Sequence, residues 1–338
     1  MSALNYRRES QMKLLVIGDE ARVNKYLPAL EITQEVERVV AQRGTSDEEI
    51  LRLAADADFI MADAISPVSA QLIESMAHLR LIHSEGVAYH AIDLKAARIC
   101  GVPVCNCRGV NAGAVAEQTI LLMLACLRDV VNGDAAVRCG QQIQTKERLM
   151  VEGIRELGDC SIGFIGAGDI ARSTMDRLAN WGCTLAYYKR TPLSFDEEKR
   201  LGAHFEPLCD LLPASDIVSI HVPVTDATRG MVNESFLAAM KRGSILINTA
   251  RGEIVNQEAL ATALSSGHIA AAGLDTLYPE PVTADHPLLN LPEAITGRIV
   301  FSPHIGGITE GMFHRAHRIV WENIARVAAG EVPINRVS

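Results

Sequence analysis

The sequence has few aromatic residues, few cysteines and no long hydrophobic run. Phe, Trp and Tyr make up 4% of its 338 residues, so base-stacking surfaces for nucleic acid are not expected. Its 41 Asp and Glu outnumber 32 Lys and Arg, and the net charge of −9 disfavours polyanion binding outside a local basic pocket. Hydrophobic residues nevertheless reach 48%, which is typical of a folded chain, and the length predicts two domains.

The eight cysteines are too sparse for a disulfide scaffold, and none form a CxxC pair. We therefore expect reduced thiols and no metal site. The longest apolar run, residues 120–127, is far shorter than the ~20 residues of a membrane span. The N-terminal segment MSALNYRRES has no apolar core of the kind that an export signal needs. These absences predict a cytoplasmic protein that binds neither membranes nor nucleic acid.

Short apolar runs alternate with helical patterns, which indicates parallel strands joined by crossover helices. The strand candidates of the first part are residues 13–17, 59–61, 79–83 and 103–105. Those of the second part are residues 161–165, 184–188, 216–222, 244–248, 272–275 and 299–302. Between the two series we expect a long apolar helix at about 112–131 and a polar stretch to residue 159. About six strands in the second series are typical of a doubly wound Rossmann sheet.

A glycine-rich turn follows the first strand of the second series. Residues 166–171 read GAGDIA and match the pattern G-x-G-x-x-G/A between an apolar strand and a helical pattern. Gly166 allows the tight turn, Gly168 lets a pyrophosphate approach the backbone, and Ala171 is small enough for helix-on-strand packing. Because the helix N–H groups would face the phosphates, the turn predicts dinucleotide binding.

The end of the next strand indicates which dinucleotide binds. NAD enzymes place an Asp or Glu here, about 20 residues after the turn, to bind the ribose 2′-hydroxyl. Residues 187–192 read YYKRTP and contain no acid. Lys189, Arg190 and Thr191 suit a 2′-phosphate, although a solvated basic turn would look the same. The sequence therefore favours NADP and leaves NAD open.

Three polar residues follow later strands of the same sheet, at the edge where open α/β sheets bind ligands. Arg251 can clamp a carboxylate and polarise a carbonyl, and His304 can exchange a proton near neutral pH. A glutamate such as Glu280 would favour and orient the protonated imidazole. Each residue alone also has a structural interpretation as a surface cation, a satisfied core imidazole or a solvated loop acid.

Together these segments resemble the D-isomer-specific 2-hydroxyacid dehydrogenase family over nearly the whole chain. The resemblance implies that His304 is the acid/base, Glu280 its partner and Arg251 the substrate anchor. It also implies that Asp275 lies near the nicotinamide carboxamide. The motifs that carry it are NxARG at 248–252, LDxxxxEP at 274–281 and PHxGG at 303–307.

The first part of the chain resembles the same family. Residues 86–93, GVAYHAID, are similar to its GVGYDxID loop, with Ala88 and His90 in place of Gly and Asp. The resemblance implies that backbone N–H groups at Val87 and Ala88 bind the substrate carboxylate together with Arg251 and His304. Residues 114–117, AVAE, match the opening of the family's interdomain helix.

The family's connectivity implies a Rossmann domain inserted into a discontinuous, flavodoxin-like substrate domain. The substrate domain would comprise residues 1–111 and 307–338, and the Rossmann domain residues 112–306, with an arm at 112–159 that forms a homodimer contact. The complete expected set of cofactor-binding residues is Gly166, Gly168, Asp169, Ile170, Lys189, Arg190, Thr191, Val222, Thr249, Arg251, Asp275, His304 and Gly306.

The resemblance implies NADP(H)-dependent reduction of a small 2-oxo acid to a D-2-hydroxy acid, similar to glyoxylate or hydroxypyruvate reductases. Formate dehydrogenases of the family carry Gln where Glu280 stands, which argues against that activity. A phosphite-type substrate stays open, although Glu85 beside the carboxylate loop should repel a dianion. The alternative from another class is a dinucleotide-sensing binding protein of the same fold with little or no catalytic activity.

Overall fold

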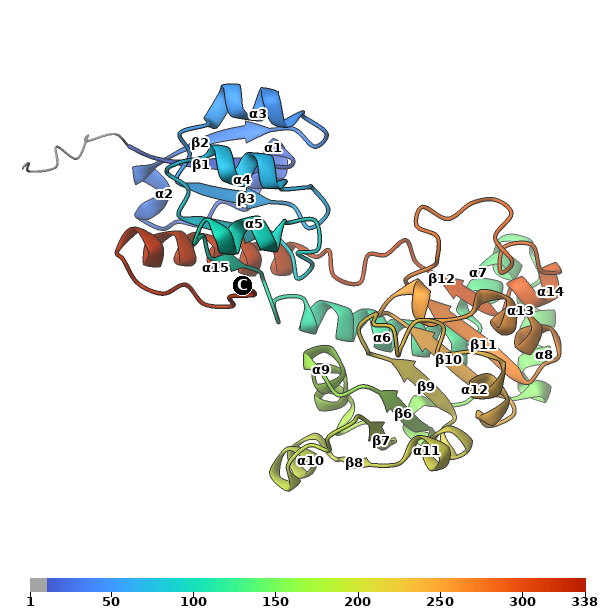
Figure 1. The fold of residues 1–338 in the computed structure, drawn as a ribbon. Helices are drawn as coiled ribbons and strands as arrows, with labels where there is room; N and C mark the ends of the chain where they lie inside the picture. Colours follow the sequence, from blue (N-terminus) through green and yellow to red (C-terminus); the bar gives the residue numbers. More distant parts are fainter. Residues whose placement is uncertain (1–10) are drawn as a thin grey trace, which may run out of the picture. The chain divides into compact units, whose positions relative to one another are not determined.

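The computed structural model describes residues 11–338, so the N-terminal segment on which the export prediction rests lies outside the described residues. The chain divides into two compact units, coloured along the sequence in Figure 1. Unit 1 comprises Met1–Asn111 and Thr309–Ser338, and unit 2 comprises Ala112–Ile308. The sequence analysis placed the return to the first unit at residue 307, two residues earlier.

Unit 1 is built on a five-stranded parallel sheet in the order β2-β1-β3-β4-β5, which is the order of a flavodoxin-like domain, as the family resemblance implies. Its strands are β1 (Met12–Ile17), β2 (Val36–Ala41), β3 (Phe59–Ala62), β4 (Leu81–Ser84) and β5 (Val104–Cys105). Its helices are α1 (Glu20–Lys25), α2 (Ile32–Glu35), α3 (Asp47–Ala54), α4 (Ala70–Ser75), α5 (Leu94–Ile99) and α15 (Glu310–Ala328).

The two faces of this sheet carry separate hydrophobic cores. Side chains alternate along a strand, so Leu15 of β1 packs against α3, α4 and α5 while Leu14 packs on the opposite face. That opposite face is covered by α1, α2 and α15, and α15 contributes the fully buried Trp321. Helix α15, near the C-terminal end of the chain, therefore completes a core to which β1 also contributes.

Unit 2 is a seven-stranded parallel sheet in the order β12-β11-β10-β9-β6-β7-β8. This order confirms the predicted doubly wound Rossmann architecture. Its strands are β6 (Ser161–Ile165), β7 (Thr184–Tyr188), β8 (Ala203–Phe205), β9 (Ile217–Ile220), β10 (Ser244–Asn248), β11 (Ile269–Leu274) and β12 (Ile299–Phe301). Its α-helices are α6 (Ala112–Leu127), α7 (Val130–Arg138), α8 (Gln142–Glu152), α9 (Asp169–Leu178), α10 (Phe195–Leu201), α11 (Leu208–Ala214), α12 (Glu234–Ala239), α13 (Gln257–Ser265) and α14 (Glu293–Thr296).

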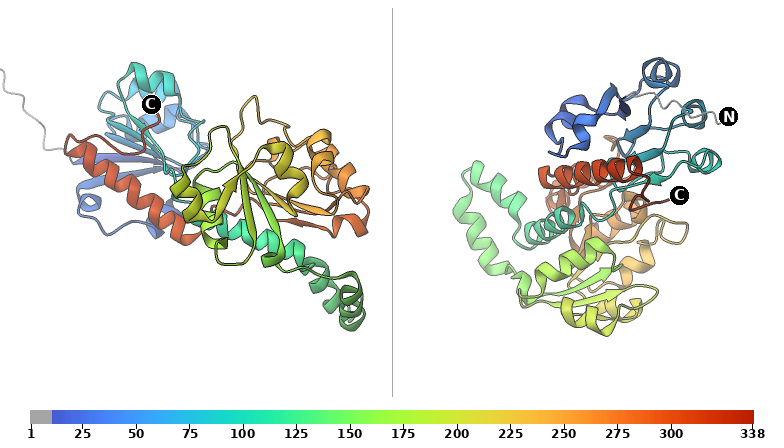
Figure 2. Two further views of the ribbon diagram at one scale, coloured as in Figure 1. Left: turned by 90° about the horizontal axis from the view of Figure 1, so that it is seen from below. Right: turned by 90° about the vertical axis from the view of Figure 1, so that its left-hand side faces the viewer.

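The single long helix expected at 112–131 is interrupted in the structure. Asp129 adopts a left-handed backbone conformation with φ 50°, which ends α6 and starts α7 in a new direction. Helix α6 packs against α9 and against β10, β11 and β12. Helices α7 and α8 extend away from the sheet as an arm of unit 2, visible in both views of Figure 2.

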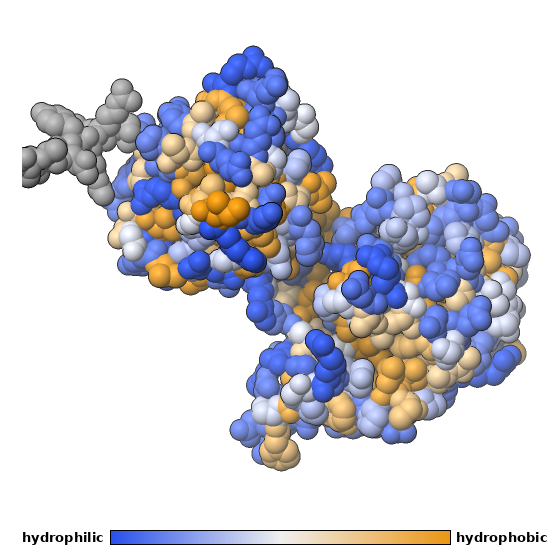
Figure 3. Space-filling model, viewed as in Figure 1, coloured by the Kyte–Doolittle hydropathy of each residue, from blue (hydrophilic) through white to orange (hydrophobic). Residues whose placement is uncertain are grey.

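The surface of each unit mixes polar and apolar side chains on the face shown in Figure 3. Among residues 11–338, no helix combines the length and the apolar character that crossing a membrane requires.

We expect Trp321 to be a main source of stability in unit 1. Trp321→Ala removes a fully buried indole and should lower the free energy of unfolding by about 3–5 kcal/mol. Trp321→Phe should cost less, because it keeps most of the volume and removes an indole N–H that has no partner in the structure. Urea denaturation followed by far-UV circular dichroism measures both. Trp181→Ala, at a partly exposed tryptophan of unit 2, is the control, and equal losses for Trp181 and Trp321 would contradict the prediction.

Candidate active site

The glycine-rich turn has the geometry that a dinucleotide phosphate needs. Gly166 has φ 103°, and a Cβ there would lie 2.6 Å from the carbonyl oxygen of His221, so no other residue fits. A Cβ at Gly168 would meet no atom within 4 Å, which leaves open space beside the turn. Gly168 is the N-cap of α9 and supplies no capping side chain. The turn therefore fits a pyrophosphate group.

Lys189 and Arg190 follow the end of β7, as predicted. Neither makes an ion pair within 4 Å in the part of the chain that the structure describes. The nearby carboxylate of Glu197 is already bound by Arg172 at 2.7 Å, and Arg172 also donates to the Ala167 carbonyl oxygen of the glycine-rich turn. The two cations after β7 therefore keep their charge available for an anion.

The hydroxyl of Tyr187 fixes the loop that carries these cations. It donates to Glu198 on α10 at 2.7 Å and accepts a hydrogen bond from the N–H of Leu193 at 2.7 Å. Burial and the bond to Glu198 raise the pKa of Tyr187 to about 12, so the hydroxyl stays protonated and can donate. Sequence analysis missed this role, because an apolar strand residue gives no signal of a hydrogen bond to a later loop.

His221 follows β9 and precedes Val222, as the sequence suggested. Burial lowers the pKa of His221 to about 3, so its ring is neutral near pH 7, and its Nε2 lies 2.8 Å from the Ser219 hydroxyl. Its carbonyl oxygen contacts Gly166. These contacts give His221 a structural role at the end of β9.

His304 and Glu280 form a close pair. The His304 Nδ1 atom lies 2.8 and 2.9 Å from the two carboxylate oxygens of Glu280. This contact fixes Nδ1 as the protonated nitrogen facing Glu280 and leaves Nε2 for another partner. Both side chains are partly exposed, so a small molecule can reach the free side of the imidazole.

The loop of His304 is held by the buried carboxylate of Asp275. One carboxylate oxygen accepts from Ser302 Oγ at 2.5 Å and from the N–H of Ile305 at 3.0 Å. The other accepts from the N–H of Gly306 at 2.9 Å. His304 itself has φ 55°, and its N–H donates to the Asp275 carbonyl oxygen. Asp275 therefore positions the histidine, whereas the resemblance implied only a contact with the nicotinamide.

The loop of Glu280 has a comparable support in His286, which sequence analysis missed. The N–H of Leu288 donates to His286 Nδ1, so the ring proton sits on Nε2, which donates to the Tyr278 carbonyl oxygen at 3.2 Å. Burial lowers the pKa of His286, which agrees with a neutral ring in this role.

Arg251 is exposed and its guanidinium donates only to the Ala250 carbonyl oxygen among the described residues. Asn248 holds its loop by donating to the Arg251 carbonyl oxygen and accepting from the Ala250 N–H. Gly252 packs so closely that a Cβ would lie 2.2 Å from the backbone carbon of Leu277. This contact places the Arg251 loop against the segment that leads to Glu280.

Thr249 is one of the expected cofactor-binding residues, and the structure buries its side chain. Its hydroxyl is buried and lies 2.9 Å from the hydroxyl of Thr119 on α6. The side chain therefore joins the strand end to α6, and only the backbone of Thr249 is left to face a ligand.

Val87 and Ala88 lie in unit 1, directly after β4 and Glu85. Glu85 is 5% exposed and is bound at both oxygens by Arg22, at 2.9 and 2.6 Å, and by His317 at 2.7 Å. Although burial opposes it, the bonds from His317 and Arg22 hold the pKa of Glu85 below its usual value. The charge of Glu85 is therefore paired with that of Arg22, which weakens the expected repulsion of a dianion.

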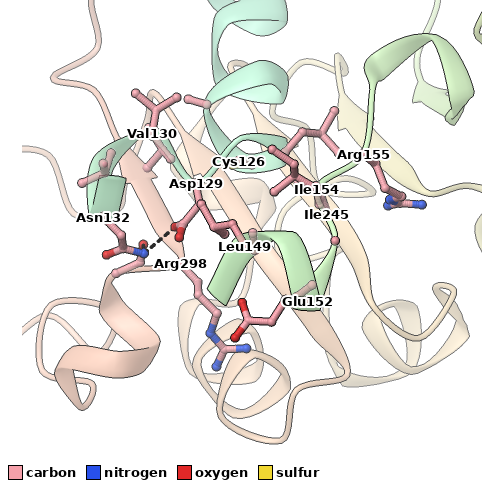
Figure 4. Close-up of a pocket in the computed structure, with 18 of the residues that line it drawn as sticks. Cys126, Asp129, Val130, Asn132, Leu149, Glu152, Ile154, Arg155, Ile245 and Arg298 are labelled. Carbon is pink, nitrogen blue, oxygen red and sulfur yellow. Dashed lines mark hydrogen bonds between the residues drawn. The ribbon is translucent and has the colours of Figure 1, made fainter. Parts of the chain in front are cut away.

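A hollow of about 840 Å³ lies at the opposite edge of the unit 2 sheet. Figure 4 shows Leu149 and Glu152 of α8 facing Ile245 and Arg298, which mark the amino ends of β10 and β12. Among residues 11–338, no group of three His, Cys, Asp or Glu side chains could hold a metal ion.

Comparison with known proteins places this site in a family. A model described as D-isomer specific 2-hydroxyacid dehydrogenase, NAD binding domain, matches residues 120–306. A glyoxylate reductase of Korarchaeum cryptofilum is 35% identical over 293 residues, which cover 87% of this chain and 86% of that protein. A mitochondrial formate dehydrogenase of Hordeum vulgare is 36% identical over 247 residues, which cover 72% and 62%.

A solved structure with a similar fold agrees with this relationship. The apo form of D-mandelate dehydrogenase from Rhodotorula graminis matches with a TM-score of 0.83 and 26% identity, covering 97% of this chain and 98% of that chain. The chain therefore belongs to the D-isomer specific 2-hydroxyacid dehydrogenase family and is an NAD(P)-dependent oxidoreductase that acts on small 2-oxo or 2-hydroxy acids.

Proposed function

We propose that this protein reduces a small 2-oxo acid to a D-2-hydroxy acid with NADP(H), and that glyoxylate is among its substrates. The observation that carries the proposal is the contact of His304 with Glu280, with Arg251 on the same sheet edge. The similarity to proteins described as glyoxylate reductases supports the choice of glyoxylate.

The residues of the chain divide the chemistry between them. A bound nicotinamide dinucleotide supplies the hydride, and the open turn at Gly168 suits its phosphates. Arg251 binds the carboxylate and stabilises the charge that develops on the substrate oxygen. His304, oriented by Glu280, donates a proton from Nε2 to that oxygen, and in the reverse direction the neutral ring accepts it. Val87 and Ala88 remain the expected backbone ligands of the carboxylate.

The Glu280 contact also separates this proposal from formate oxidation. Formate oxidation transfers a hydride without moving a proton to a substrate oxygen, so it needs no acid/base pair. A carboxylate that contacts His304 Nδ1 with both oxygens orients the ring and leaves Nε2 for a substrate oxygen.

We expect His304→Asn to lower kcat/KM for glyoxylate by roughly 10²–10⁴, because it removes the general acid. Asn tolerates the left-handed backbone at this position, so the loop should keep its shape. NADPH oxidation in the presence of glyoxylate, hydroxypyruvate, pyruvate and phenylpyruvate measures the effect.

The chain offers a matched control in a second exposed pair, His204 with Glu206 at 2.9 Å. His204→Asn should leave turnover unchanged. Unchanged turnover in His304→Asn would overturn the assignment of the acid. Absence of turnover in the unaltered protein with all four acids would favour the alternative, a protein that senses the dinucleotide.

For the cofactor, we expect Arg190→Ala to raise the KM for NADPH about 10-fold or more and to leave the KM for NADH unchanged. The reason is the loss of a charge-assisted bond to the 2′-phosphate, which NADH lacks. Steady-state kinetics with both cofactors measure this. Arg200→Ala is the control, because Arg200 forms only an exposed pair with Asp176. Equal losses with NADPH and NADH would show that Arg190 does not bind the 2′-phosphate.

We also propose that the arm forms a homodimer contact. Helices α7 and α8 bury no residue within the chain, and residues 130–154 expose seven large apolar side chains. They are Val130, Val131, Val137, Ile143, Met150, Val151 and Ile154. A second copy of the chain can cover such a surface in a self-complementary contact, which is the commonest form of symmetric assembly.

The double variant Met150→Glu with Val151→Glu should convert the dimer to a monomer, because it would place two charges in an apolar interface. Light scattering after size-exclusion chromatography gives the mass of each form. Leu53→Glu, at a comparably exposed apolar residue of α3, should remain dimeric. A monomeric unaltered protein, or a double variant that is still dimeric, would refute the proposed contact.

A further inference from the structure

Three successive carbonyl groups after β4 are each bound by a donor from within unit 1. The N–H of Cys107 donates to the Gly86 carbonyl oxygen at 2.9 Å. The Asn106 Nδ2 donates to the Val87 carbonyl oxygen at 2.7 Å, and the Ser84 hydroxyl donates to the Ala88 carbonyl oxygen at 2.6 Å. All three donor residues are buried, so the direction of these carbonyls is fixed by the core of unit 1.

Because a peptide bond is planar, a carbonyl that is held in place also fixes the direction of the N–H group of the next residue. In a trans peptide, the carbonyl of one residue and the N–H of the next point in opposite directions. All peptide bonds of this loop are trans, because the cis bonds of the described chain precede Pro279 and Pro281. The N–H groups of Val87, Ala88 and Tyr89 therefore point away from the donors that hold the preceding carbonyls.

These three N–H groups donate to no acceptor among the described residues. Val87 and its neighbours are also at least partly exposed, so an external group can reach the loop. Backbone N–H groups that have no acceptor within the protein can bind an anion without any charged side chain.

The strand end beneath the loop is rigid. Glu85 is clamped by Arg22 from α1 and by His317 from α15, and its N–H donates to the Ala62 carbonyl oxygen of β3. A Cβ at Gly86 would lie 2.9 Å from the Ala64 side chain, so the loop also packs closely against the segment after β3. The loop is therefore held from several elements before any ligand arrives.

We propose that Ser84 and Asn106 are positioning residues for the substrate. By holding the carbonyls of Ala88 and Val87, they turn the N–H groups of Val87, Ala88 and Tyr89 outward as a preformed site for the carboxylate of a 2-oxo acid. The inference rests on the proposed function. It adds the Tyr89 N–H to the expected carboxylate ligands and names the two side chains that hold the loop in place.

The test uses Asn106→Asp and Ser84→Ala in the full-length protein. Asn106→Asp is nearly isosteric and still accepts from the Arg108 N–H, but it cannot donate to the Val87 carbonyl oxygen. Each variant should raise the KM for glyoxylate and the inhibition constant of oxalate about 10-fold, because the carboxylate site is no longer preformed. The kcat at saturation should change less than about 3-fold, and the KM for NADPH should not change.

Two buried residues of unit 1 give matched controls. Ser66→Ala removes a buried hydroxyl that has no partner, and Asn323→Asp disturbs an amide that joins α15 to His83 and Ile334. Both should leave the KM for glyoxylate and oxalate inhibition unchanged, and circular dichroism melting shows which variants lose stability.

The outcomes distinguish a failure of the positioning role from a failure of the proposed function. If the unaltered protein reduces glyoxylate and both Ser84→Ala and Asn106→Asp keep its KM and oxalate inhibition, the positioning role is wrong and the proposed function stands. If the unaltered protein reduces no 2-oxo acid, the proposed function fails. If one of the two variants does not fold, the other decides.

Discussion

The chemistry of unit 2 depends on the buried carboxylate of Asp275. A carboxylate without partners would be costly to bury, but this one accepts three hydrogen bonds from the loop after β12. Those bonds hold His304 in a left-handed conformation that non-glycine residues avoid, at a cost of about 1–2 kcal/mol. The bent loop turns Nδ1 toward Glu280 and exposes Nε2. The hydrogen bonds of one strand end thus set the direction of the proposed acid.

Parallel topology explains why distant sequence segments act together. The glycine-rich turn, the Arg251 loop and the His304 loop follow β6, β10 and β12, so all of them lie at the carboxyl edge of one sheet. Unit 1 has the same kind of edge, with its switch point between β1 and β3. At that switch point Asp63, which directly follows β3, accepts hydrogen bonds from Arg43 at 2.7 and 3.0 Å. In unit 2 a Cβ at Gly168 would meet no atom within 4 Å, so its switch point leaves space for a dinucleotide.

The sequence predicted the elements that have strong local signals. Apolar runs located most strands, and the glycine pattern located the turn, since both depend on residues that are neighbours in the chain. It missed β2, whose residues VERVVA include two adjacent charged side chains, and β8, which has only three residues. It also missed the break at Asp129, because a left-handed residue inside an apolar helical pattern leaves no mark in composition.

The supporting residues of the site were the hardest to predict. His286, Tyr187, Asn106 and Ser84 act through hydrogen bonds to backbone atoms of other segments, and such bonds depend on the finished fold rather than on spacing. Motif residues carry charges that chemistry requires, so their types can be recognised in sequence. Supporting residues need only place a donor at one point, and several residue types on several elements can do that. The same reasoning explains Glu85: its charge was visible in the sequence, but its bonds with Arg22 and His317 require α1, β4 and α15 to meet. The charge of a residue therefore predicts the electrostatic potential around it only when its ion-pair and hydrogen-bond partners are known.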